Sequence, residues 1–176
     1  MNLRAELLPR RVSAQKREEI ERAIGEIEDL LEQGEDQEGH VALEAFNARY
    51  GQSYQPDDFC SRAEELTQAE WAWRIAQPPI RRIADITREE LIEIVRRIQQ
   101  PEHAAEQQRE DEAGEAWSEG MSFRGHEAAL QDFYLELLEA QVAMPDVSDL
   151  IFWNDLEPEE VVDRALAYQP IILPPG

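Results

Sequence analysis

Basic residues are scarce in this chain. Its 176 residues include 17 Lys and Arg against 39 Asp and Glu, which gives a formal net charge of −22 at pH 7. A protein that binds nucleic acid through the phosphates needs a basic surface, so we expect no direct contact with nucleic acid. The natural complement of so acidic a chain is a basic protein partner.

Cysteine and long apolar runs are also lacking. The single cysteine, Cys60, cannot form a disulfide within the chain, and no Cys or His spacing matches a zinc site. No stretch is apolar enough for a signal peptide or a membrane span. The sequence therefore predicts a soluble cytoplasmic protein that neither binds a metal nor contacts a membrane.

Motifs of catalysis and cofactor binding are missing as well. The chain has no glycine-rich dinucleotide loop or Walker loop, no H-E-x-x-H, no G-x-S-x-G and no EF-hand series. Its three histidines, His40, His103 and His126, lie far apart in the sequence. With 39 carboxylates, a possible acid–base pair carries no information. We therefore expect no enzyme activity and no cofactor.

Amphipathic helices dominate what is present. The i, i+3, i+4 rhythm of apolar residues predicts helices over residues 20–33, 87–100 and 126–142 and from Pro158 onward. Gly34 marks the end of the first helix, and Pro101 ends the second. Thr87 and Glu90 have the spacing of a capping box, which satisfies two amide donors at a helix start. Because no convincing alternating strand is found, the predicted fold class is all-α.

Two helical domains are predicted, over residues 1–80 and 81–176. In the second, acids and glycines dominate residues 101–125, so we expect a loop or mobile insertion there. The two halves repeat several features in the same order, and their apolar stripes have identical spacing: Ile20, Ala23, Ile24 and Ile27 against Leu91, Ile94, Val95 and Ile98. Internal duplication would explain this repetition. The alternative is one helical domain whose halves share only amphipathic patterning.

One long segment near the C-terminus carries acids without bases. Residues 126–163 contain 11 Asp and Glu and no Lys or Arg. Solvated helix faces usually mix the two signs. An unpaired acidic field repels itself, and its evident use would be to steer a cationic partner.

Adjacent aromatic residues lie inside this acidic segment, after Pro145. We expect Ser148 to cap a short helix and Leu150 and Ile151 to turn inward. One helical turn cannot easily bury both Phe152 and Trp153, so at least one of them should be exposed. Exposed aromatics ringed by carboxylates are typical of an interface hot spot. The alternative is that both aromatic rings fill the core.

These residues resemble a family. The run Ser148-Asp-Leu-Ile-Phe-Trp153 after Pro145 is similar to the Ser-Asp-Leu-Ile-Tyr-Tyr segment of the immunity proteins that neutralise HNH-type nuclease colicins and pyocins. That segment forms the family's short third helix. The similarity extends outward, so that three segments look like the family's first, second and fourth helices: 83–98, 128–142 and 157–168. The resemblance implies an immunity-like four-helix bundle in the C-terminal half.

The resemblance also implies a binding site. Ser148, Asp149, Phe152 and Trp153 would form the nuclease contact shared by the family, while three acids of the second helix would tune partner choice: Asp132, Glu136 and Glu139. Phe152 and Trp153 replace two tyrosines, and Asn154 stands where the family has Pro. The first 80 residues have no counterpart in the short family members unless they are a degenerate copy.

The sequence thus favours an all-helical immunity protein with a related N-terminal domain packed on the C-terminal one. It would act without catalysis, as a stoichiometric inhibitor of a cognate basic nuclease toxin. An acidic helical adaptor, or a nucleic-acid mimic that regulates another basic protein, is the alternative.

Overall fold

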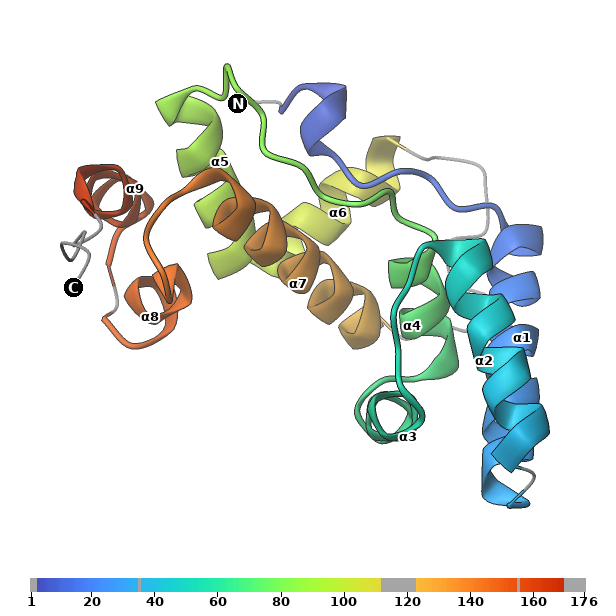
Figure 1. Ribbon diagram of the computed structural model, residues 1–176. Helices are drawn as coiled ribbons and strands as arrows, with labels where there is room; N and C mark the ends of the chain where they lie inside the picture. The colour runs from blue at the N-terminus through green and yellow to red at the C-terminus, as the bar shows by residue number, and fades with distance from the viewer. Residues whose placement is uncertain (1–2, 35, 112–122, 155, 170–176) are drawn as a thin grey trace, which may run out of the picture. The chain divides into compact units, whose positions relative to one another are not determined.

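The computed structural model is helical, and it describes residues 3–34, 36–111, 123–154 and 156–169. No strand occurs among these residues, so the all-α prediction is confirmed (Figure 1). After a short 3-10 helix, η1 (Ala5–Leu7), the elements are α1 (Ala14–Glu32), α2 (Asp36–Tyr50), α3 (Pro56–Glu65), α4 (Gln68–Ile75), α5 (Arg88–Gln99), α6 (Pro101–Asp111), α7 (Phe123–Gln141), α8 (Val147–Phe152) and α9 (Pro158–Ala167). None of the described helices has the length and apolarity needed to cross a bilayer.

The chain forms two compact units, and neither is one continuous stretch. Unit 1 comprises Met1–Pro9, Pro79–Ala113 and Leu130–Gly176, and unit 2 comprises Arg10–Pro78 and Gly114–Ala129. The domains expected from the sequence were 1–80 and 81–176. They differ from the two units because Met1–Pro9 belongs to unit 1 and Gly114–Ala129 belongs to unit 2. At the N-terminus the segment contacts unit 1, since the Arg4 guanidinium donates to the Asp85 carboxylate at 3.0 and 3.2 Å.

Unit 2 is built around an aromatic core. α1 packs against α2, α3 and α4, and its stripe Ile20, Ile24 and Ile27 is buried as predicted. Phe59 of α3 and Trp71 of α4 lie with ring centroids 4.5 Å apart. Burial of such large rings supplies much of the stabilisation of a small unit.

Unit 1 is built on α5, which packs against α6 and α9. The predicted capping box opens α5: the Thr87 hydroxyl oxygen accepts from the Glu90 amide at 3.2 Å, and the Glu90 carboxylate accepts from the Thr87 amide at 2.9 Å. The stripe of α5 is buried, as are the apolar positions of the neighbouring helices: Leu91, Ile94, Val95, Ile98, Leu130, Leu137, Leu138, Val147, Val161 and Val162.

The segment 101–125 is largely not the predicted loop. α6 occupies Pro101–Asp111, and α7 already begins at Phe123. Pro101 suits a first helical position because its missing amide hydrogen costs nothing there. Ala104 and Ala105 give α6 a buried face despite its many acids. The rest of the segment that was predicted to be mobile, residues 112–122, lies outside the described residues.

A close approach explains why the first turns of α7 belong to unit 2. A Cβ atom on Gly125 would lie 1.8 Å from the Glu70 carboxylate, so only glycine fits there without a shift. Glu70 is itself engaged in a capping box with Thr67 at the start of α4. The spacing of Thr67 and Glu70 is the sequence signal for this second capping box.

The two halves share an order of elements. In unit 2 the first helix, α1, packs against the last, α4, and in unit 1 α5 packs against α9. The positions predicted to correspond, such as Ile20 and Leu91, are buried in both. α6 has no counterpart among α1 to α4. Internal duplication itself stays a prediction.

Candidate functional site

α8 presents two aromatic side chains to solvent. Its inward residues Val147, Leu150 and Ile151 are buried, whereas Phe152 is 50 % exposed and Trp153 is 83 % exposed. The prediction that at least one aromatic is accessible is confirmed, and the alternative that both fill the core is wrong. The reason is the shortness of the helix, because its buried turn is already filled by aliphatic residues and α8 packs against α9.

The start of α8 differs from the prediction. Asp146, not Ser148, is the N-cap residue, and Ser148 lies inside the helix. Asp146 adopts the left-handed conformation with φ 52°, which Asp tolerates better than most residues. Its carbonyl oxygen accepts from the Asp149 amide at 3.0 Å. This backbone turn, not a side-chain cap, begins the helix.

The end of α8 is closed by two hydrogen bonds to one carbonyl group. The backbone oxygen of Asp149 accepts from the Trp153 amide at 3.1 Å and from the side-chain amide of Asn154 at 2.8 Å. Asn154 therefore adds a second hydrogen bond to a carbonyl group near the C-terminal end of the helix. The sequence marked Asn154 only as a departure from the family's Pro, and the known preference of Asn for helix C-termini was the available signal.

Carboxylates accompany the aromatic pair. Asp146 and Asp149 are exposed, and Asp149 and Trp153 have the i, i+4 spacing that places side chains on one face of a helix. We call Asp146, Asp149, Phe152 and Trp153 the α8 surface. It joins an anionic group and a large apolar ring on one short element.

The acids around the α8 surface are less uniformly unpaired than the sequence indicated. Arg88 of α5 binds Asp163 of α9 through two hydrogen bonds of 2.7 and 2.9 Å. This hydrogen bonding holds the pKa of Asp163 below its usual range. Other acids of α9 pair similarly, Glu160 with Arg164 at 2.6 Å and Glu159 with an arginine of α5 at 3.5 Å. The prediction of an unpaired field is therefore wrong for α9, because most of its partners come from α5.

The acids expected to tune partner choice lie on α7. Asp132 is partly buried and Glu136 is exposed, and both take part in interactions within the chain. Glu139 is exposed. Their i, i+4 and i+3 spacing puts the three on one stripe of α7, and the link 142–146 joins that helix to α8. The structure brings together Ser148, Asp149, Phe152 and Trp153 in or directly after α8, and it keeps the three acids on the preceding helix.

A buried polar cluster joins α5 to α7 within unit 1. The Arg97 guanidinium donates to the Tyr134 hydroxyl at 2.7 Å and to the Glu93 carboxylate at 3.2 Å, and Arg96 also donates to Glu93 at 2.7 Å. Burial raises the pKa of Tyr134. Because each charge is paired, the cluster fixes how α5 and α7 meet. Sequence reasoning did not find it, since the partners lie 37 residues apart.

The described residues form no metal site, and the comparisons with known proteins give no match. Among the described residues, no three His, Cys, Asp or Glu side chains are grouped so as to hold a metal ion. Comparison with known proteins gave no match, since no family model, curated protein or solved structure is significantly similar to the chain. The resemblance to immunity proteins thus rests on the residues quoted for it.

Proposed function

We propose that this protein is an immunity protein, which binds a cognate basic nuclease toxin through the α8 surface and inhibits it stoichiometrically. The observation that carries the proposal is Trp153, whose indole is 83 % exposed on a helix with exposed carboxylates. A monomeric protein rarely leaves so large a ring in water beside a second exposed aromatic. Desolvated aromatic contact is the commonest source of binding energy at interfaces.

The net charge of the chain also supports a basic nuclease as the partner. A nuclease needs a basic surface to hold phosphates, and a chain with a net charge of −22 attracts such a surface before contact. Exposed Glu139 and Asp149 would contribute to encounter, and Phe152 and Trp153 would hold the complex. The bound protein would then deny nucleic acid access to the toxin by its bulk and its negative charge, without any catalytic step.

The rigidity of α8 favours tight binding. The helix is anchored by buried aliphatic residues on one side and closed by Asn154 at its end. A surface that is ordered before the partner arrives loses less conformational entropy on binding. Trp153 is a C-cap residue whose backbone is already fixed by the bond to Asp149.

Affinity capture followed by a nuclease assay tests the proposal. The full chain would be used to capture partners from the host lysate, and the captured protein would be identified by mass spectrometry and assayed for nuclease activity. We expect a basic nuclease that loses activity at one equivalent of the chain. Trp153→Ala should release it, while Val41→Ala should not, because Val41 is an exposed apolar residue of α2 in unit 2. A captured nuclease that stays fully active in the complex would contradict inhibition.

The acids of α7 allow a second test, which measures the rate of association with the partner. Neutralising Asp132, Glu136 and Glu139 together should slow association at low salt and flatten its salt dependence, because rim charges act mainly on association. Unchanged association would remove α7 from the binding site. Capture of a basic protein that is not a nuclease would favour the alternative function, an acidic adaptor or nucleic-acid mimic.

A further inference from the structure

The N-terminal segment 3–9 is docked in unit 1. We call it the strap. Leu7 is fully buried, and Leu3 and Pro9 are buried with it. One turn of 3-10 helix, Ala5–Leu7, lies within the strap, and the Leu7 amide donates to the Arg4 carbonyl at 2.9 Å. A segment of this length has no core of its own, so its leucines are buried only while it is docked.

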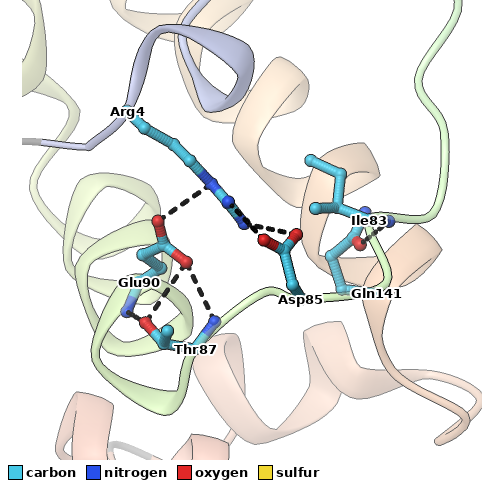
Figure 2. A network of polar contacts seen from close by, with 6 residues as sticks. All are labelled: Arg4, Ile83, Asp85, Thr87, Glu90 and Gln141. Atoms are coloured by element: carbon cyan, nitrogen blue, oxygen red, sulfur yellow. Dashed lines mark hydrogen bonds and ion pairs between the residues drawn. The ribbon is translucent and has the colours of Figure 1, made fainter.

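Arg4 fastens the strap to the start of α5 (Figure 2). Its guanidinium donates to both oxygens of Asp85, at 3.0 and 3.2 Å, and its Nε lies 3.1 Å from the carboxylate of Glu90. The bidentate bond holds the pKa of Asp85 below its usual range. Two-pronged arginine–carboxylate pairs are stronger and more directional than single contacts.

Glu90 contacts two partners through its two carboxylate oxygens. One of its carboxylate oxygens accepts from the Thr87 amide in the capping box of α5, and the other faces Arg4. Figure 2 shows the incoming chain held from the other side, where Gln141 of α7 accepts from the Ile83 amide at 2.7 Å. The chain that leads into α5 is therefore held by the end of α7 at Ile83 and by the strap at Asp85 and Glu90.

α5 in turn supports the helices that carry the α8 surface. Arg88, at its first position, holds Asp163 of α9, and Gln99, at its last, donates to the Leu156 carbonyl just before α9 at 2.8 Å. α9 packs against α8. A loosened first turn of α5 would first free the Arg88–Asp163 end of this connection.

We infer that the strap is a fastening device for unit 1: docked, it clamps the start of α5, and released, it loosens α5 and α9 while unit 2 stays folded. The strap and its anchor are 81 residues apart in the chain, and the residues between them include the continuous part of unit 2, Arg10–Pro78. The device follows from contacts within unit 1, and it holds whether or not the protein inhibits a nuclease.

Hydrogen exchange of the full chain, followed by mass spectrometry, tests the device. In Arg4→Ala/Leu7→Ala, amides of α5 and α9 should exchange roughly tenfold faster or more, because a buried leucine and a clamp are both lost. Amides of α1 should stay within about twofold of the parent. Arg4→Lys keeps the charge but not the two-pronged geometry, so it should give a smaller acceleration in α5 alone.

Arg164→Ala is the matched control. It removes an exposed arginine of unit 1 that pairs with Glu160 four residues before it, and it should leave α5 exchange unchanged. Unchanged exchange in α5 of the double variant would overturn the inference. Equal acceleration in α1 and α5 would overturn it too, since the strap would then stabilise the whole chain and not unit 1. If the double variant does not fold, the same comparison of α5 with α1 is made on Arg4→Ala.

Discussion

α3 and α8 occupy the same place in the order of their units, yet they use aromatic residues in opposite ways. Each lies at a Pro-Asp pair and precedes the last helix of its unit. Phe59 of α3 is completely buried against Trp71, whereas Phe152 of α8 is half exposed and Trp153 almost fully so. An aromatic residue thus contributes to stability in one unit and is available for binding in the other. If the halves share an origin, only unit 1 has exposed aromatic residues at this place.

Stability should separate the two aromatics most strongly. Phe59→Ala removes a ring from the core of unit 2 and should cost about 3–5 kcal/mol of the free energy of unfolding. Phe152→Ala should cost less than about 1 kcal/mol, because half of its ring is already in water. Denaturant unfolding followed by circular dichroism measures both. Equal losses would break the contrast between α3 and α8.

For binding to a partner, we expect the exposed aromatic residues of α8 to matter more than the buried ring of α3. Trp153→Ala should raise the dissociation rate of a captured partner about thirtyfold or more, as expected when a central interface aromatic is truncated. Its free energy of unfolding should stay within about 0.5 kcal/mol of the parent. Surface plasmon resonance with Val41→Ala as the control measures the effect. A Trp153→Ala variant that dissociates like the control would place binding elsewhere.

A smaller effect is expected where α7 meets α4. Gly125→Ala would push its methyl group against the Glu70 carboxylate, which must then leave the Thr67 capping box. Loss of such a cap costs about 1 kcal/mol. The Thr67→Ala background removes the same cap in advance, so Gly125→Ala should cost less there. Additive losses in a denaturant series would contradict this coupling.

The C-terminal cap of α8 sharpens the comparison further. Asn154→Asp keeps the shape of the side chain but removes the donor to the Asp149 carbonyl, which should cost about 1 kcal/mol locally. We expect faster amide exchange at Trp153 by NMR, with α3 and α9 unaffected. Exchange at Trp153 as slow as in the parent would show that buried aliphatic residues alone hold the helix.

The smallest effect should be on acid stability. Arg88 lowers the pKa of exposed Asp163 below its ordinary value of 3.8, so the folded state binds this proton less readily than the unfolded state. The pair therefore stabilises above pH 3.8 and loses its effect as the pH falls through the lower folded pKa. Arg88→Ala should be slightly less stable than the parent at about pH 6 and equal to it once the pH lies below the folded pKa of Asp163. A difference that persists in acid would point to lost packing by the arginine stem.

Local features of this fold were predictable, and long-range pairings were not. The helices follow from the spacing of apolar residues, and the capping box at Thr87 depends on groups three residues apart. The exposure of Trp153 also followed from local reasoning, because one turn of helix has few inward positions. By contrast, Asp163 finds its arginine 75 residues away, and the strap finds Asp85 at a similar distance. Periodicity carries no information about such pairs.

The errors at single positions have local causes. Ser148 was expected to cap α8 because serine commonly does so, but Asp146 turns the chain two residues earlier through a left-handed backbone. α6 was missed because acids hide its short buried face of two alanines. The sequence alone predicts the candidate site residues of α8 as one group. The roles of Asp146 and Asn154 in shaping the ends of this helix are seen only in the structure.

The strap has a consequence for synthesis on the ribosome. The strap is made before the anchors of Arg4, Asp85 and Glu90, and well before the helix end at Gln141. At about 5–20 residues per second, the strap waits on the order of ten seconds in water before its site is complete. Residues 10–78 emerge in the meantime and supply the four helices of unit 2. The strap would thus be made before its anchors and reach its native place only after residues 10–78 have been made.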